Sequence, residues 1–321
     1  MSLQISISFK ANSFNQEAIS FIFENFQIKK IEYENQFEWV PVKNRSELLN
    51  IDFSQVKFKL KYGGDRIIIQ NMNNSAPRIF GDKLDLENLI LIKDFIEKKY
   101  LKIILSGRIQ HSLESLQNSD DSSIWEIYNK DIPPYAQLIK NPLYREGHPG
   151  MDMIKKEFIS IESLPGHQHL MNYDDMLWFG SSWQMYFSTL YYKYIPKPLF
   201  DDFKDCYENI IFENGLRKIT LHKNVMDYDL PENRQRQWSF RQQLGIDSIA
   251  HELTRSSNRI EPLNLPVIIT KQNCEKGQTR VTRFLDDNNK LISSDKAAKK
   301  EIKEYLDDGL TVVLETIVDN L

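Results

Sequence analysis

Glycine is scarce in this chain, with 12 among 321 residues, roughly half of its usual share. Loops that bind nucleotide phosphates need glycine, because only a residue without Cβ lets the backbone approach the phosphate closely. No two glycines have the G-x-G spacing, none precedes a Lys-Ser or Lys-Thr pair, and no G-x-S-x-G occurs. The sequence therefore carries no signature of a dinucleotide-binding, Walker A or α/β-hydrolase site.

Cysteine is rare and long apolar runs are missing. The two cysteines, Cys206 and Cys274, make neither a disulfide framework nor a set of zinc ligands. No apolar run approaches the roughly 20 residues that span a bilayer. The first residues, MSLQISISF, also lack the apolar segment of a secretory signal. We therefore expect a soluble, reduced protein of the cytoplasm, with no cofactor and no membrane partner.

Neither sign of charge dominates, because 41 Lys and Arg residues against 45 Asp and Glu residues give a net charge of −4. A general nucleic-acid coat needs a basic surface, so the composition disfavours a nucleic-acid partner. The chain has enough apolar material for a core, with 41% hydrophobic and 12% aromatic residues. At ~150 residues per domain, its length predicts two domains.

Strand and helix patterns are mixed along the first half. Residues 3–9 alternate between apolar and polar, which predicts a half-buried strand. The alternation over 56–62, followed by Gly63-Gly64-Asp65 and the apolar run 67–69, predicts an antiparallel hairpin. Apolar residues at helical spacing predict helices over 14–26 and 85–98.

The second half continues this mixture. We expect strands over 157–161, 217–222, 265–270 and 279–285, and helices over 182–194, 198–214, 246–256 and 294–306. The mixture predicts an α+β fold, with antiparallel sheets and helices packed on their faces. Prolines at 133, 134, 142 and 149 mark a boundary between two subdomains. We place an N-terminal α+β domain at 1–135 and a C-terminal α+β domain, with an aromatic-rich segment, at 136–321.

Histidines and acids between 148 and 175 form the first candidate site. In His167-Gln-His169 two imidazoles lie on one side of an extended segment, where both can reach one metal ion. His148, Asp174 and Asp175 can supply further ligands. H-x-H is a short pattern, however, and the Pro-Gly pair before it favours an exposed loop. A metal site needs converging ligands and supporting groups, so the sequence leaves both interpretations open.

His251-Glu252-Leu-Thr-Arg255 comes close to the H-E-x-x-H zinc motif. Arg255 stands where the motif needs its second histidine and cannot bind zinc, so we reject this interpretation. The apolar face of the helix expected over 246–256 directs Asp247, His251 and Arg255 to the solvent. There they would form a charge ladder worth ~0.3 kcal/mol per pair.

Arginines and aromatic residues are interleaved in Arg234-Gln-Arg236-Gln-Trp238-Ser-Phe240-Arg241. The pattern is typical of nucleic-acid contacts, in which arginines hold phosphates and aromatics stack on bases. It is equally typical of protein interfaces, where Arg and Trp are frequent anchors. Burial of Trp238 and Phe240 in the core is a third interpretation. Acidic neighbours weaken the first, so we favour a protein contact at Arg236 and Trp238.

The densest aromatic run comprises Trp178, Phe179, Trp183, Tyr186, Phe187, Tyr191, Tyr192 and Tyr194. One face of a single helix cannot bury all of these side chains. The excess therefore meets a second layer of the same core or another protein. In the second case Trp178, Trp183, Tyr191 and Tyr192, beside Asp174 and Asp175, would receive a partner with a basic surface.

Missing catalytic motifs, mild acidity and this aromatic excess favour a cytoplasmic protein-interaction protein without catalytic activity. A bacterial immunity-type inhibitor of a basic toxin is one concrete form. The alternative is a hydrolase or metal-dependent enzyme with a site near His148, His167, His169 and Asp174. A third possibility is a nucleic-acid accessory protein that uses Arg234, Arg236 and Arg241.

Overall fold

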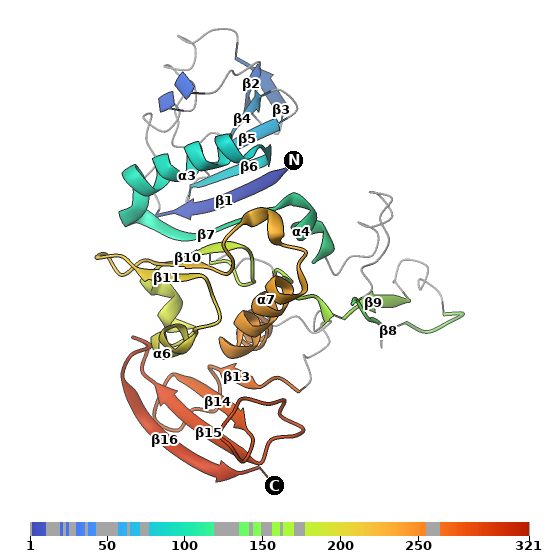
Figure 1. The fold of residues 1–321 in the computed structure, drawn as a ribbon, viewed down its shortest axis with the longest axis vertical. Coiled ribbons are helices and arrows are strands. Elements are labelled where there is room, and N and C mark those ends of the chain that lie inside the picture. Colours follow the sequence, from blue (N-terminus) through green and yellow to red (C-terminus); the bar gives the residue numbers. More distant parts are fainter. Residues whose placement is uncertain are drawn as a thin grey trace.

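The computed structural model of the chain describes residues 2–10, 20–21, 24–25, 30–35, 38–42, 57–62, 65–70, 77–118, 135–140, 144–148, 156–160, 163–169, 177–254 and 264–320. Two antiparallel sheets and the helices between and upon them form an α+β fold, as the sequence predicts (Figure 1). Among the described helices, none combines the length and the apolar character that crossing a membrane requires.

The larger sheet, which we call the main sheet, is antiparallel throughout and has the strand order β11-β12-β10-β7-β1-β6-β5-β4-β2-β3. Its strands are β1 (Leu3–Phe9), β2 (Lys30–Asn35), β3 (Glu38–Pro41), β4 (Lys57–Tyr62), β5 (Asp65–Gln70), β6 (Arg78–Leu84), β7 (Ile104–His111), β10 (Gln184–Phe187), β11 (Glu208–Ile211) and β12 (Arg217–Thr220). The expected strand over 3–9 and the expected hairpin, β4 with β5, are confirmed.

A first core lies between one face of the main sheet and α3 (Leu86–Tyr100), which continues into η1 (Leu101–Ile103) (Figure 1). The helix begins where the Asp85 side chain accepts a hydrogen bond from the Asn88 N–H at 2.8 Å. Its residues Leu89, Ile92 and Ile96 are buried against the sheet. The helix expected over 85–98 is thus confirmed, whereas most of the one expected over 14–26 lies outside the described residues.

A second core lies between the main sheet and a four-stranded sheet. The small sheet has the order β13-β14-β15-β16, with β13 (Val267–Thr270), β14 (Thr279–Leu285), β15 (Lys299–Tyr305) and β16 (Val312–Asp319). The helices between the sheets are η4 (Thr189–Lys193), α6 (Lys197–Asp202), α7 (Pro231–Gln243) and α8 (Ile246–Thr254), whereas η5 (Val225–Asp227) packs against the first core (Figure 1). The helix expected over 246–256 and the strands expected over 217–222, 265–270 and 279–285 are confirmed.

Three of the expected helices are wrong. Residues 182–194 form β10 and η4, and β10 lacks the alternation of a half-buried strand because all four of its residues are buried. Residues 198–214 form only α6 before the chain turns into β11. Residues 294–306 include β15, whose charged residues fit helical spacing but pair with β14 on one side and β16 on the other.

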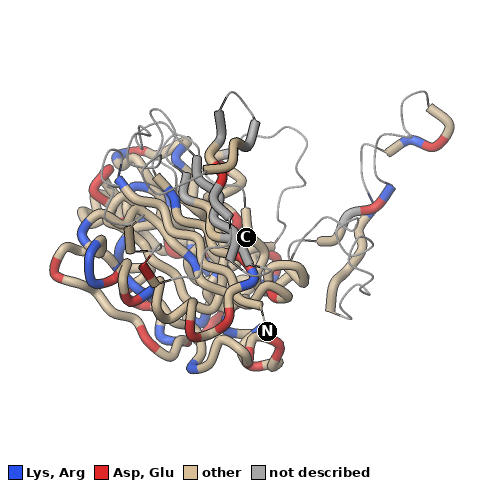
Figure 2. Tube along the Cα trace, turned by 90° about the horizontal axis from the view of Figure 1, so that it is seen from above, with Lys and Arg blue, Asp and Glu red and all other residues tan. Residues whose placement is uncertain are grey.

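The predicted domain boundary at 135 stays a prediction. Strands from both sides of it share the main sheet, because β10 pairs with β7 from Gln184–Ile109 to Phe187–Ser106. Residues just beyond 135 form a separate ladder of β8 (Leu138–Lys140) and β9 (Glu157–Ile159). This ladder stands out from the body of the molecule (Figures 1 and 2).

Candidate binding site

Most of the aromatic run belongs to the interior, which corrects its interpretation as a partner surface. Trp178, Tyr191 and Tyr192 are at most 6% exposed and lie in the second core. Trp183 is half-buried, and its indole N–H donates to the His222 carbonyl at 2.7 Å. Asp174 and Asp175 lie outside the described residues.

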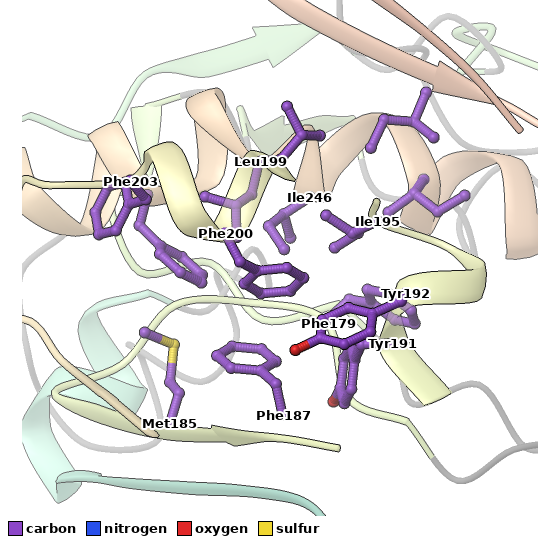
Figure 3. Close-up of a cluster of buried hydrophobic side chains, with 14 of the residues drawn as sticks. Phe179, Met185, Phe187, Tyr191, Tyr192, Ile195, Leu199, Phe200, Phe203 and Ile246 are labelled. Atoms are coloured by element: carbon purple, nitrogen blue, oxygen red, sulfur yellow. The ribbon is translucent and has the colours of Figure 1, made fainter. Parts of the chain in front are cut away.

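Figure 3 shows how these rings pack. The Phe187 ring meets Tyr191 edge-on with centroids 4.9 Å apart, and it lies 5.1 Å from Phe200. The Tyr191 hydroxyl donates to the Trp178 carbonyl at 2.6 Å and accepts from the Trp178 N–H at 3.0 Å. Because each ring has its partners inside the molecule, these side chains hold the two sheets together and are not free to contact another protein.

The three predicted metal-binding histidines do not come together. His148 is exposed at the end of 144–148, whereas His167 and His169 are buried with ring centroids 4.8 Å apart. The ring of His169 donates through Nε2 to Asp247 at 2.6 Å. In the part of the chain that the structure describes, no group of three His, Cys, Asp or Glu residues is arranged to hold a metal ion. The metal site therefore stays a prediction.

Asp247 is only 4% exposed, so its expected place on a solvent-facing charge ladder is wrong. Both of its oxygens accept hydrogen bonds from Arg241 at 2.8 Å. Burial by itself raises the pKa of the Asp247 carboxyl, but the Arg241 charge and the His169 hydrogen bond outweigh it and hold the pKa well below its usual range. Burial lowers the pKa of His167 well below its usual value, which keeps that ring neutral at pH 7.

This buried network fixes the loop 163–169 against α7. A terminal nitrogen of Arg241 donates to the Leu164 carbonyl, and the Gly166 N–H donates to the Asn118 side chain at 2.8 Å. A Cβ at Gly166 would lie 2.7 Å from the Asn118 amide nitrogen, so only glycine fits this approach. The loop is therefore held at a defined position beside the helix.

A second buried contact fixes α7 from the other side. The Gln237 side chain donates to Glu114, which also accepts from the His111 N–H at 3.2 Å. Glu114 lies in α4 (Ser112–Gln117), directly after β7. Burial raises the pKa of Glu114 to about 8, despite the hydrogen bonds that favour its charged form. These polar side chains attach α7 to α4 and to the end of β7.

The buried stripe of α7 consists of Asn233, Gln237, Phe240 and Arg241. The helix begins with Pro231 in its first turn, where a missing N–H costs nothing. This buried stripe is mostly polar. The opposite face of the helix carries the remaining Arg, Gln and Trp side chains and meets the solvent.

An open cleft of about 430 Å³ lies along this outward face. Its walls come from three separate segments, namely 135–137, 163–165 and the first two turns of α7. The lining residues are Tyr135, Gln137, Ser163, Pro165, Pro231, Arg234, Gln235 and Trp238. The loop 163–165 that the Arg241 network holds in place forms one of these walls.

Arg234 lines the cleft, and its positive charge is paired with Asp229. Its guanidinium lies 5.0 Å from the centroid of the Tyr135 ring, in a cation–π position. The same guanidinium donates to the carboxylate and the carbonyl of Asp229. The cleft is thus aromatic and polar, but close to neutral.

Arg236 faces away from this cleft. Its side chain lies 3.5 Å from Asp205 and donates to Asn233 at 2.8 Å. Arg241 is only 2% exposed, so it cannot serve as a phosphate contact. Lys and Arg are interspersed with Asp and Glu along the described trace (Figure 2). The arginines of α7 therefore do not form a basic patch among the described residues, and the nucleic-acid hypothesis gains no support.

Sequence reasoning singled out Trp238 and its neighbouring arginines but missed the residues that complete the cleft. Tyr135, Ser163 and Pro165 precede α7 by 66 residues or more. Only the folded chain brings them there, so no local pattern signals them. The start of α7 itself had a signal, because Pro231-Glu232 is typical of a first helical turn.

Comparison with known proteins gives no match, neither to a family model, nor to a curated protein sequence, nor to a solved structure.

Proposed function

We propose that this protein binds another protein, and that the cleft on α7 takes an extended peptide segment of the partner. The observation that carries the proposal is the gathering of Trp238, Tyr135 and Arg234 around an open cleft. Trp, Tyr and Arg are the side chains that contribute most binding energy in protein interfaces. The other large group of aromatics is buried, which leaves the cleft as the contact region that the described residues support best.

The lining favours an extended segment with apolar or proline side chains. Aromatic-lined grooves are typical of domains that bind polyproline-like peptides. The cleft volume lies within the ~300–1,000 Å³ that is usual for binding pockets. Gln137 and Gln235 at the rim are both exposed, and their amides can bond to the peptide backbone of a ligand.

The charge of the cleft bears on the partner. Asp229 offsets Arg234, so the segment in the cleft has no reason to carry a strong charge. A partner with a basic surface, as expected from Asp174 and Asp175, remains a separate part of the proposal. Neutralisation of a toxin is its narrowest form, and the identity of the captured partner would decide it.

Site-specific photo-crosslinking tests this proposal. A benzophenone amino acid at position 235 should crosslink one defined partner in cells of the native host, identified by mass spectrometry. Trp238→Ala in the same protein should reduce that product at least about tenfold, a loss of ~1.4 kcal/mol. The control is the benzophenone at position 207, since Tyr207 is 60% exposed and lies outside the cleft. Equal products from positions 235 and 207, or no effect of Trp238→Ala, would refute the proposal.

A specific observation also favours the hydrolase alternative. The isolated bridge between Gln168 and Gly180 sets Ser181 opposite His167. Ser181 Oγ and His169 Nδ1 are buried and have no hydrogen-bond partner among the described residues. A serine beside a His–Asp pair is a nucleophile arrangement, and Ser181 lies opposite His167, two residues before the His169 that pairs with Asp247. Labelling by a fluorophosphonate probe, lost in Ser181→Ala, would support this function, and absence of labelling would remove it.

Metal content and chelator-induced loss of stability test the metal-dependent form.

A further inference from the structure

Exposed apolar side chains are concentrated at the C-terminal edge of the small sheet. Among the described residues, twelve large hydrophobic side chains are exposed, and five of them lie between Leu306 and Val318. These are Leu306, Leu310, Val312, Ile317 and Val318. Such a concentration within one short segment is typical of a contact surface.

The segment coincides with an unprotected strand edge. β16 pairs with β15 on one side and ends the strand order, so among the described residues no strand pairs with its other side. Natural proteins usually protect such edges with lysines, prolines or bulges. The eight residues of β16, VVLETIVD, contain no lysine and no proline, and the one irregularity in its pairing with β15, at Val313, leaves residues 314–319 in regular register. Within the described part of the chain no strand bonds to its outer N–H and C=O groups, so another strand can pair there.

We propose that the occupant of this edge is a second copy of the chain, whose own β16 pairs with it antiparallel. The two small sheets then form one continuous eight-stranded sheet. A two-fold axis perpendicular to the sheet relates the copies, so the two faces of β16 continue on the same two sides of the joined sheet. Two residues that lie opposite each other must therefore both have odd numbers or both have even numbers.

The charges of β16 favour one of two registers, which differ in the residue that lies on the two-fold axis. With Glu315 on the axis, two carboxylates face each other directly, which is destabilising. With Thr316 on the axis, Thr316 faces Thr316 and Leu314 faces Val318 of the second copy, while Glu315 faces Ile317. No two like charges are then directly opposite. Threonine pairs and apolar pairs are both favourable across antiparallel strands.

The neighbouring strand supports the register on Thr316. Lys303 of β15 lies 3.0 Å from Glu315, and this ion pair is kept when Glu315 faces Ile317 of the second copy. Thr316 also pairs with Ile302 inside its own sheet. In the dimer the threonine pair would be flanked by Ile302 from both copies, which extends an apolar strip across the joint. The inference concerns a surface remote from the α7 cleft and does not depend on the proposed function.

Sedimentation of the full chain over a concentration series tests the proposal. The wild type should reach twice its monomer mass of 37.9 kDa. Thr316→Lys and Thr316→Glu each place like charges together on the axis, and each should weaken the dimer at least about tenfold. A mixture of the two variants should restore it as a heterodimer, because opposite charges then meet. This restoration also shows that both variants are folded.

Two further variants serve as controls. Thr316→Val keeps a β-branched side chain on the axis and should leave the dimer unchanged. Tyr207→Lys adds the same charge at an exposed place away from the edge and should also leave it unchanged. A wild type that stays monomeric at all concentrations would overturn the proposal and leave the edge to a strand of another protein. A dimer insensitive to Thr316→Lys, or not restored by mixing, would overturn it as well.

Discussion

Two aromatic-rich segments of this molecule lie in opposite environments. The run from Trp178 to Tyr194 forms β10 and its flanks and contributes to both cores, mainly the second, whereas Trp238 on α7 lines an open cleft. In the sequence both segments look like interface candidates. The difference arises from their neighbours, because β10 has a strand on each side and a core on each face. α7 is covered on one face only.

The contrast shows that aromatic density does not by itself predict a contact surface. The core aromatics bond to nearby backbone, as the Tyr191 hydroxyl does to Trp178. The cleft aromatics lie beside a surface ion pair, Arg234 with Asp229. We therefore expect substitutions in the first segment to change stability, and substitutions in the second to change binding.

The largest effect is expected from Phe187→Ala. Phe187 is fully buried against Tyr191, Phe200 and Phe240, so its removal leaves a cavity. We expect a loss of roughly 3–5 kcal/mol in the free energy of unfolding, measured with urea. The matched control is Tyr207→Ala at an exposed aromatic, with a loss below about 0.5 kcal/mol. Similar losses for both variants would contradict the assignment of β10 to the core.

Two arginines of α7 allow a comparison, because Arg241 is buried and Arg234 lies at the exposed end of the helix. Asp247→Asn leaves the charge of buried Arg241 uncompensated and should cost ~3 kcal/mol in urea unfolding. Asp229→Asn removes the partner of Arg234 at the exposed end, where such pairs contribute ~0–1 kcal/mol. If both variants lose the same stability, the buried network does not fix α7 as the structure indicates.

Glu114 makes stability depend on pH. Its pKa is raised in the folded state, so its contribution is fully present below the pKa of the unfolded chain and is lost as pH rises toward about 8. Between pH 6.5 and 8 we expect the wild type to lose stability relative to Glu114→Gln, by at most about 1.4 kcal/mol per pH unit. The lowered pKa of His167 acts mainly below this window. Urea unfolding of both proteins at each pH measures the difference, and a constant difference would show that Glu114 is ionised throughout.

The smallest effect on stability is expected from Trp238→Ala. The side chain is half-buried at the cleft, so its loss should lower the free energy of unfolding by less than about 1 kcal/mol. The same variant should strongly reduce partner capture. A loss as large as that of Phe187→Ala would make Trp238 a core residue and remove the contrast between the two segments.

Elements with a one-sided apolar pattern were predictable from sequence, as β1, α3 and α8 show. β10 was not, because burial on both faces removes the alternation that identifies a strand. α7 was not recognised as a helix because its buried stripe is mostly polar and is satisfied by Glu114 and Asp247. Those partners are distant in sequence or, like Asp247, were expected at the surface.

The residues of the candidate site, too, were predictable only where the pattern that joins them is local in the sequence. Trp238 and Arg234 are only four residues apart in the chain, so the sequence already placed them near each other. Pro165 reaches the cleft through the contacts of its loop with Asn118 and Arg241, and the segment 135–137 is joined to that loop by the Gln137 N–H, which donates to Ser163. No local spacing encodes these contacts. The outcome for the histidines has the same cause, since the partner of His169 comes from α8.

The position of β7 between β1 and β10 also has a consequence during synthesis of the protein. On the ribosome, β1, β6 and β7 can pair as soon as they emerge, but β10 follows β7 by about 75 residues. At ~5–20 residues per second, the outer edge of β7 waits ~4–15 s for its partner. During that interval a nascent chain presents an unpaired strand edge to its surroundings. Translation speed between these two strands thus sets how long each new molecule is exposed to aggregation.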